Sequence, residues 1–302
     1  MKIIISGGTG LIGSALTNSL LADGHTVWIL TRAATNAPVF TRGARPVQWD
    51  GHSADSWLDI FSDMDAVVNL AGSTIGAWPW TAARKRSILE SRVNAGRAIL
   101  AACQKTSKRP GVLIQASGIG YYGPRAAETI DESAPAGNDF LAQIATAWEA
   151  ATQPVETLGV RRCIIRTAVV LAKDQGILPL MELPVKLFAG GPLGNGKQGL
   201  SWIHIDDQVA AIRFLLENPQ ASGPFNLTSP NPLSNADFMR SLAKVLQRPY
   251  WLPAPAFALK IALGEMSTLL LDGQFATPHN LTRLGFHFKY GKIGDALTHL
   301  HG

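Results

Sequence analysis

The first thirteen residues limit the folds open to this chain more than any other segment. An isoleucine run at positions 3–5 is followed by Gly7, Gly10 and Gly13, and then by an apolar-periodic segment that ends near residue 24. A buried strand that passes through a glycine turn into a helix lets the backbone approach the pyrophosphate of a dinucleotide at the helix N-terminus. This context predicts a Rossmann-type fold in which the three glycines contact a bound dinucleotide.

The end of the next predicted strand indicates which dinucleotide is bound. That strand covers residues 26–30 and is followed by Thr31 and Arg32, without a carboxylate. NAD-binding units place an acidic side chain here to hold the ribose 2′-hydroxyl, whereas a guanidinium pairs with the 2′-phosphate of NADP. Thr31 and Arg32 therefore predict NADP(H) as the cofactor; the alternative is that Arg32 is an ordinary solvated arginine.

Strand-like and helix-like segments alternate through the first half of the chain. The predicted strands are residues 3–5, 26–30, 46–49, 66–70, 112–117 and 162–167, and the predicted helices are residues 54–61, 81–104 and 139–158. Strands separated by helices form right-handed crossovers, which build a doubly wound parallel sheet. The expected fold class is therefore α/β, a Rossmann-type sheet that binds its ligands at the carboxyl ends of the strands.

Proline and glycine interrupt this alternation after residue 170. We therefore assign residues 1–170 to an NADP(H)-binding Rossmann domain and residues 171–302 to a smaller C-terminal substrate lobe. A helix pattern at 207–216 and a strand pattern at 223–227 predict that residues from about 200 to 228 return to the Rossmann domain.

The composition is typical of a globular enzyme. Hydrophobic residues make up 46% of the 302 residues and charged residues 16%, which excludes a disordered chain. The sequence enters its first predicted strand without a secretory leader, so we expect a cytoplasmic protein. The most apolar stretch, residues 257–271, contains Lys260 and Glu265 and is short for a membrane span. We expect it to be a packing helix, and we expect no membrane association.

A net charge of +5 and an isoelectric point near 9.3 raise the question of nucleic-acid binding. The basic excess lies within residues 81–109, where Lys and Arg far outnumber a single acid, Glu90. A long helix would carry these charges on a solvated face, and no nucleic-acid motif or aromatic platform accompanies them. We therefore expect no nucleic-acid partner.

Motifs spread over most of the chain resemble the extended short-chain dehydrogenase/reductases. They are Gly7-Gly8-Thr9-Gly10-Leu11-Ile12-Gly13, Asn69-Leu70-Ala71-Gly72, Tyr122-Gly123, Arg166 with Val170, and Trp202-Ile203-His204-Ile205-Asp206-Asp207. A second set resembles an atypical epimerase-family subgroup, and it comprises Ser91-Arg92, Gly120-Tyr121-Tyr122-Gly123, Trp148-Glu149-Ala150-Ala151 and Gly190-Gly191-Pro192-Leu193-Gly194-Asn195-Gly196. Members of this subgroup resemble nucleoside-diphosphate-sugar epimerases and bind NADP(H). They also carry a small C-terminal domain of undefined function, which would cover residues 250–294 here.

The resemblance implies cofactor contacts beyond the three glycines. The residues concerned are Thr9, Leu11, Ile12, Leu70, Ala71, Gly72, Arg92 and Val170. The backbone at Leu70 and Ala71 would pass beneath the adenosine ribose, and Val170 would lie near the nicotinamide. Arg92 would reach a cofactor phosphate from the long helix, although one more surface charge is the alternative.

The usual catalytic groups of the superfamily are missing from their expected positions. Its Tyr-x-x-x-Lys dyad maps to Leu141 and Ala145, and its serine maps to Gly118. In that dyad the lysine lowers the pKa of the tyrosine, so that the tyrosine acts as a general acid or base. Standard epimerase chemistry is therefore not expected here.

Three nearby hydroxyl groups are candidate catalytic groups, on Ser117, Tyr121 and Tyr122. Ser117 lies one residue before the usual serine, so a regular strand directs it to the opposite face unless the following turn rotates it back. The tyrosine at position 122 most often packs beneath the strand end in such folds. His204, just before Asp206, fits a helix-capping role better than a catalytic one.

Two functions from different classes follow from these observations. The first is an NADP(H)-dependent oxidoreductase or epimerase-like enzyme that acts on a carbonyl compound or sugar nucleotide with a non-standard acid. The second is an NADP(H)-binding sensor or partner-binding protein without turnover. The enzyme is favoured because a complete substrate lobe is retained. We expect no metal site, and a homodimer is one assembly that the sequence leaves open.

Overall fold

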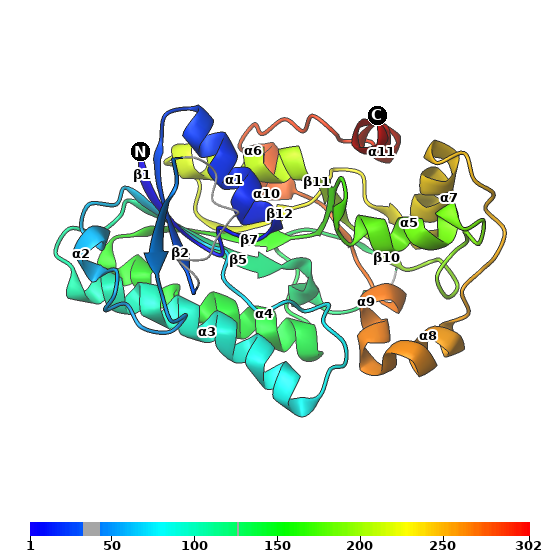
Figure 1. Cartoon of the computed structure of the whole chain (residues 1–302), viewed down its shortest axis with the longest axis horizontal. Helices are drawn as coiled ribbons and strands as arrows, with labels where there is room; N and C mark the ends of the chain where they lie inside the picture. Colours follow the sequence, from blue (N-terminus) through cyan, green and yellow to red (C-terminus); the bar gives the residue numbers. More distant parts are fainter. Residues whose placement is uncertain (33–42, 126) are drawn as a thin grey trace.

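The computed structural model describes residues 1–32, 43–125 and 127–302, and its centre is a seven-stranded parallel sheet (Figure 1). The strands are β1 (Lys2–Ser6), β2 (Thr26–Thr31), β3 (Arg45–Gln48), β4 (Ala66–Asn69), β5 (Val112–Gly118), β7 (Arg161–Thr167) and β12 (Gly223–Leu227). Their order in space is β12-β7-β5-β4-β1-β2-β3. This order reverses between β1 and β4, which is where doubly wound sheets open a crevice for ligands. The predicted fold class is confirmed.

Helices cover both faces of this sheet. One face is covered by α1 (Leu11–Ala22) and α6 (Ile205–Glu217), and the other by α2 (Leu58–Phe61), α3 (Ala82–Lys105), α4 (Phe140–Ala150) and the 3-10 helix η2 (Gln153–Leu158). Alternate residues of β1 belong to the two cores: Ile3 and Ile5 pack with α1, and Ile4 packs with α2 and α3. Because both faces are buried, the strands read as continuous apolar runs.

The rest of the described chain contributes small sheets and helices outside the seven-stranded sheet. Its strands are β6 (Thr129–Ile130), β8 (Val169–Ala172), β9 (Gln175–Gly176), β10 (Gly199–Leu200), β11 (Trp202–His204), β13 (Leu233–Ser234) and β14 (Phe275–Ala276). Its helices are η1 (Ile119–Tyr122), α5 (Leu178–Lys186), α7 (Asn235–Val245), α8 (Ala256–Leu263), η3 (Gly264–Ser267), α9 (Thr268–Leu271), α10 (His279–Arg283) and α11 (Ile293–His301). Two elements from this half of the chain belong to the large sheet, as the sequence predicts: β12 is one of its strands, and α6 packs on one of its faces.

Two predicted helices are shorter in the structure. The segment predicted over residues 139–158 ends its α-helix at Ala150, because Pro154 has no amide hydrogen to donate and its ring would clash with the carbonyl of that residue. The helix predicted over residues 54–61 begins only at Leu58. The carbonyl oxygen of Ser53, which would accept the first helical hydrogen bond, accepts the indole N–H groups of Trp49 and Trp57 instead.

The prediction of one packing helix at 257–271 is wrong. The segment divides into α8, η3 and α9 at Gly264, whose φ of 58° lies in the left-handed region. Phe257 and Ile261 are 69% and 83% exposed, so α8 is not a buried packing element. Within residues 1–32, 43–125 and 127–302, no helix is both long enough and apolar enough to cross a membrane.

Candidate functional site

The glycine turn after β1 packs too closely for side chains at two of its three positions. A Cβ atom on Gly7 would lie 2.7 Å from the carbonyl oxygen of Leu70, and one on Gly13 would lie 2.2 Å from the carbonyl oxygen of Gly7. A Cβ on Gly10 would meet only that Gly7 oxygen, at 3.4 Å. Gly7 and Gly13 are therefore required for the fold of the turn itself, whereas a Cβ at Gly10 would make ordinary van der Waals contact.

The N-terminus of α1 fits an anionic group. Gly10 is its N-cap without a side-chain hydrogen bond, and its first turn contains no acidic residue. The first N–H groups of a helix lack intrahelical acceptors, and the helix dipole favours negative charge there. Thr9 is exposed beside this end, and Leu11 and Ile12 are half-buried. The turn and the helix end therefore fit the pyrophosphate of a dinucleotide.

The end of β2 lies next to the glycine turn. A Cβ on Gly8 would meet the Ile29 side chain at 2.8 Å, so β2 packs directly against the turn. Thr31 ends the strand, and Arg32 follows it with an exposed side chain. The Gln48 side chain donates to the carbonyl of Arg32 at 3.0 Å, which fixes the backbone at this point. The structure thus brings the predicted 2′-phosphate residues to the expected edge of the crevice.

The segment after β4 passes beneath the glycine turn. The amide of Leu70 donates to the carbonyl of Ser6 at 3.0 Å, and Ala71 follows half-buried. Asn69, fully buried, accepts from the Ser6 hydroxyl at 2.6 Å. A Cβ on Gly72 would lie 2.9 Å from the guanidinium carbon of Arg92. The three segments therefore form one crevice around the switch point of the sheet.

Arg92 is a buried cation with unused donor capacity. It is 6% exposed, and Nη1 donates to the carbonyls of Ser73 and Ile88 at 3.0 Å. Its guanidinium lies 4.8 Å from the centre of the Trp148 ring, and its Nε makes no hydrogen bond to the described residues. Burial, helped by the charge of Arg84, lowers the pKa of Arg92 to about 10. A buried guanidinium with a free N–H is suited to an anionic ligand.

A cavity of about 480 Å³ opens beyond the carboxyl ends of β5 and β7. Its walls come from α4, α5, α9 and the loops after β5, β7 and β10. Leu141 and Ala145, which occupy the dyad positions, both line it, as does Gly118. The mapping of the dyad is therefore consistent with the structure, and the wall at this point is apolar. Val169 lines the cavity, whereas the neighbouring Val170 pairs with Ile203 in the small sheet.

Several cavity residues were not found by sequence reasoning. Trp148, Met181 and Gln198 lie on segments far apart in the chain, and only the tertiary structure brings them together. Asp272, which also lines the cavity, lies one residue beyond the helix predicted at 257–271. The sequence did offer one indication that Trp148 belongs to a site: it directly precedes Glu149 in a motif that carries the family resemblance.

Ser117 is the candidate hydroxyl that lines the cavity. It is 5% exposed, and its Oγ donates to Oε1 of Glu149 at 2.7 Å. Glu149 also accepts two hydrogen bonds from Arg166, at 2.9 and 3.0 Å. This bidentate pair raises the pKa of Arg166 further above its usual value, against the opposing effect of burial. The serine is thus held by a buried ion pair.

The two candidate tyrosines lie behind this ion pair. Tyr122 is fully buried, donates to Oδ1 of Asn226 at 2.7 Å and accepts from Arg166 at 3.1 Å. Burial raises the pKa of Tyr122 to about 12, which disfavours release of its proton. The guanidinium carbon of Arg166 lies 3.5 Å from the centre of the Tyr121 ring. Neither tyrosine belongs to the described lining of the cavity, and their catalytic roles stay predictions.

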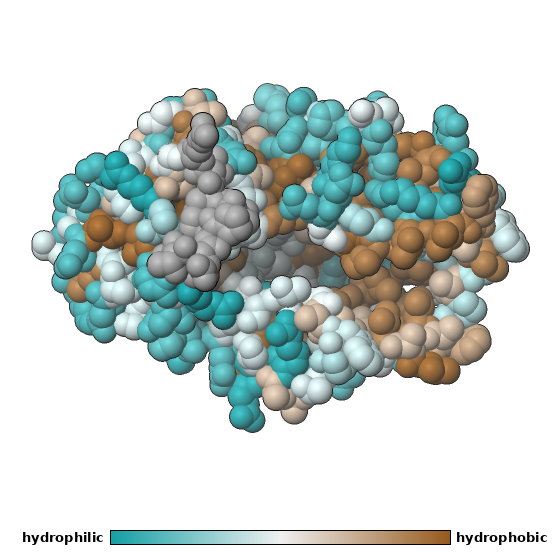
Figure 2. Space-filling view, viewed as in Figure 1, coloured by the Kyte–Doolittle hydropathy of each residue, from teal (hydrophilic) through white to brown (hydrophobic). Residues whose placement is uncertain are grey.

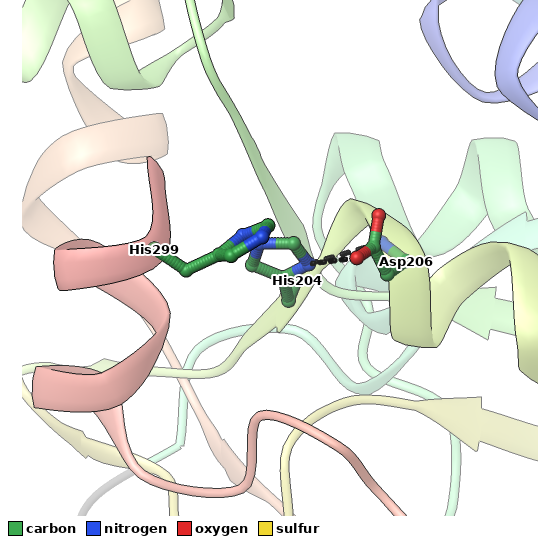
Figure 3. A group of neighbouring side chains, drawn as sticks. All are labelled: His204, Asp206 and His299. Atoms are coloured by element: carbon green, nitrogen blue, oxygen red, sulfur yellow. Dashed lines mark hydrogen bonds and ion pairs between the residues drawn. The ribbon is translucent and has the colours of Figure 1, made fainter. Parts of the chain in front are cut away.

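A separate cluster of titratable groups joins the C-terminal helix to α6 (Figure 3). Nδ1 of His204 accepts the backbone N–H of Asp206 at 3.0 Å, so the expected capping role is confirmed. The neutral ring then carries its hydrogen on Nε2, 3.1 Å from Nδ1 of His299. This tautomer makes the two rings a hydrogen-bonded pair in which both His204 nitrogens are engaged. The cluster is therefore explained without an ion.

We expect His204 to make stability depend on pH. Burial lowers the pKa of His204 to about 4, so between about pH 6.5 and that value the unfolded chain takes up a proton that the native state does not. The free energy of unfolding should therefore fall by about 3 kcal/mol as pH drops through this window. Urea denaturation at pH 7 and pH 4 measures it. In His204→Asn, which keeps a capping acceptor, the slope should be correspondingly smaller, and an unchanged slope would contradict the assignment.

Family models match almost the whole chain. Residues 3–228 match the NAD dependent epimerase/dehydratase family, and residues 254–300 match the domain of unknown function DUF1731. The epimerase family protein YfhF of Bacillus subtilis is 42% identical over 301 residues, covering 99% of this chain and 98% of that protein. The chloroplastic SDR39U1 homologue of Arabidopsis thaliana is 39% identical over 300 residues, covering 98% of this chain and 86% of that protein.

Solved structures share the same fold. Human epimerase family protein SDR39U1 (isoform 2), solved with NADPH, has a TM-score of 0.86 at 29% identity and covers 99% of both chains. The nucleoside-diphosphate sugar epimerase from Corynebacterium glutamicum has a TM-score of 0.80 at 33% identity, covering 100% of this chain and 58% of that one. The chain thus belongs to the NAD dependent epimerase/dehydratase family and ends in a DUF1731 domain.

Proposed function

We propose that this protein binds NADP(H) and transfers a hydride between that cofactor and a carbonyl-containing small molecule, without a Tyr-x-x-x-Lys dyad. The observation that carries the proposal is that the predicted cofactor site at the N-terminus of α1 and the cavity adjoin each other. The uncapped N-terminus of α1 and the buried Arg92 flank the crevice, and Arg92 also lines the cavity. A bound dinucleotide would therefore extend from the glycine turn toward the cavity. The NADPH of the human relative supports the choice of cofactor.

The residues of this chain would have distinct tasks in such a complex. Gly10 and the first N–H groups of α1 would hold the pyrophosphate, and Arg32 would pair with the 2′-phosphate. Arg92 would supply a charged donor from the opposite wall. When bound, the nicotinamide supplies the hydride chemistry. The apolar side chains of Leu141 and Ala145 would pack against the substrate.

Cofactor preference is a direct test of the end of β2. We expect NADPH to bind roughly 10- to 100-fold more tightly than NADH, because hydrogen bonds from a guanidinium to a phosphate are worth about 1.5–3 kcal/mol. Arg32→Asp should narrow or reverse this preference, since a carboxylate repels the 2′-phosphate and accepts from the 2′-hydroxyl. Isothermal titration calorimetry with both cofactors measures it. Equal affinities in the unmutated protein would contradict the argument.

A sensor without turnover is a second candidate, favoured by one observation. Leu141 and Ala145 place no acid or amine on the cavity wall where the family dyad would stand. A screen of carbonyl compounds and nucleotide sugars with deuterated NADPH distinguishes the two functions, with transfer read by mass spectrometry. Deuterium in a product establishes an enzyme, and its absence across the panel favours the sensor.

The basic residues of α3 support a small molecule over nucleic acid as the ligand. Arg84 donates to the carbonyl of Thr74, and Lys85 pairs with Glu265. At the other end of the helix, Nζ of Lys105 lies 3.0 Å from Oδ1 of Asp55. These charges are thus partly satisfied within the chain, and a solvated helix face accounts for the remainder.

A further inference from the structure

The charged side chains on the substrate side of the cavity are acidic. Asp139 and Asp272 both line it, the first at the start of α4 and the second directly after α9. Partial burial and the nearby Asp139 raise the pKa of Asp272, while Lys260 opposes this effect. Lys260 does not belong to the described lining of the cavity. The ionisable groups of the described lining on this side are therefore two carboxyl groups, with no cation among them.

Two side-chain amides of the lining already donate to backbone carbonyls. Nε2 of Gln198 donates to the carbonyls of Leu193 and Leu270, at 3.0 and 2.8 Å. Nε2 of Gln274 donates to the carbonyl of Gly123 at 2.7 Å. A phosphate group entering the cavity would have to displace these hydrogen bonds to find donors, and an unsatisfied buried anion is costly.

The N-termini of α4 and α7 at the cavity are likewise unsuited to a phosphate. Asp139 caps α4, where its Oδ1 accepts the N–H of Ala142 at 2.8 Å. Ser234 caps α7, which has Asp237 in its first turn. An acid at a helix N-terminus takes the place that an anionic ligand would use. Among the described lining residues the one cation is Arg92, and its contact with Gly72 places it on the cofactor side.

The rim of the cavity is apolar and exposed. Met181 lines the cavity from α5, while Leu180 and Leu183 on the same helix are 67% and 55% exposed. Leu269 of α9 lines the cavity and is 37% exposed. Figure 2 shows apolar surface over α5 and over the α8–α9 region, on the two sides of a recess. An apolar substrate would meet a matching surface at this entrance.

We infer that the substrate is an uncharged, apolar ketone or aldehyde, or the corresponding alcohol, and not a nucleoside-diphosphate sugar. This inference rests on the proposed function and specifies its substrate class. Reduction transfers one hydride from NADPH to the carbonyl carbon and one proton from water to the oxygen, which leaves NADP⁺, an alcohol and hydroxide. The two lining carboxyl groups and the committed side-chain amides of Gln198 and Gln274 disfavour a diphosphate, whereas the apolar walls stabilise an uncharged carbonyl compound.

The test uses the full chain saturated with NADPH, with saturation confirmed first by calorimetry. Acetophenone, cyclohexanone and UDP-glucose are then compared by saturation-transfer difference NMR. We expect saturation transfer to at least one ketone and binding of UDP-glucose at least about tenfold weaker. Leu269→Asp should reduce the ketone signal severalfold. Leu252→Asp, 43% exposed on the segment between α7 and α8 and outside the described lining, is the matched control and should leave the ketone signal unchanged.

A charge-reversal variant is expected to gain affinity for the nucleotide sugar. Asp272→Lys should raise the affinity for UDP-glucose about tenfold, because it places a cation where the cavity now has a carboxylate. Tighter binding of UDP-glucose than of both ketones by the unmutated protein would overturn the inference, as would no ketone signal at all. Failure of the proposed function is a different result, namely no NADPH binding by calorimetry or no deuterium transfer from deuterated NADPH to any compound of the panel. Deuterium transfer to a nucleotide sugar, with no ketone signal, would overturn the substrate class alone.

Discussion

Replacing Arg166 with leucine is expected to lower the free energy of unfolding by about 3–5 kcal/mol, since removal of one partner leaves the other charge buried and unpaired. The side chains of Arg166 and Glu149 are 5% and 11% exposed, and the pair is joined by two hydrogen bonds. The same arginine donates to the hydroxyl of Tyr122. Urea denaturation followed by circular dichroism measures the change.

Two further variants test whether this loss comes from the buried pair. Arg240→Leu breaks an exposed pair with Asp237 and should cost less than about 1 kcal/mol. The double variant Arg166→Leu/Glu149→Leu should be less destabilised than the two single changes predict together, because it leaves no orphaned charge. A cost below about 1 kcal/mol for Arg166→Leu would show that the pair is not needed for the fold.

The second large effect concerns cofactor binding without loss of the fold. Gly10→Ala should weaken NADPH binding on the order of 10- to 100-fold, because the new methyl group stands where the pyrophosphate approaches the backbone. The fold should tolerate it, since the added Cβ meets only the carbonyl oxygen of Gly7, at 3.4 Å. Calorimetry gives the affinity, and thermal unfolding without cofactor gives the stability.

Matched glycine variants separate the two effects. Gly13→Ala places its Cβ 2.2 Å from the carbonyl oxygen of Gly7, so it should destabilise the apo protein as well. In Gly111→Ala the new Cβ would lie 3.7 Å from the carbonyl oxygen of Asp65, which is ordinary van der Waals contact. Gly111 directly precedes the start of β5, at the end of the strand that is away from the cavity. Gly111→Ala should change neither the NADPH affinity nor the stability of the apo protein. Wild-type NADPH affinity in Gly10→Ala would mean that the pyrophosphate binds elsewhere.

Local patterns in the sequence were sufficient for the central sheet. The isoleucine run of β1 and the helix–strand alternation predicted a doubly wound sheet, which β12 completes as its seventh strand. Parallel strands buried on both faces leave a continuous apolar signal that needs no tertiary information. The helix ends were less predictable: α4 stops at Ala150 ahead of Pro154, and the region after Ala256 breaks at Gly264.

The candidate site likewise has one part whose arrangement follows from the sequence and one part that only the tertiary structure reveals. The proximity of the predicted cofactor residues follows from the sequence, because they come after the ends of β1, β2 and β4, which lie side by side in the parallel sheet. The cavity could not be predicted, since Trp148, Met181 and Asp272 come from separate elements. The role of Ser117 also depended on a contact distant in the chain, as its hydroxyl donates to Glu149 on α4.

The sequence by itself determined the sheet, the glycine turn and the absence of the dyad at Leu141 and Ala145, because each depends on neighbours within a few residues along the chain. The tertiary structure decided what surrounds those positions. It buried Arg92 with an Nε that makes no hydrogen bond to the described residues, and it placed Asp139 and Asp272 in the wall of the cavity. Burial and charge at a site are sums over distant residues, so only the folded chain fixes them.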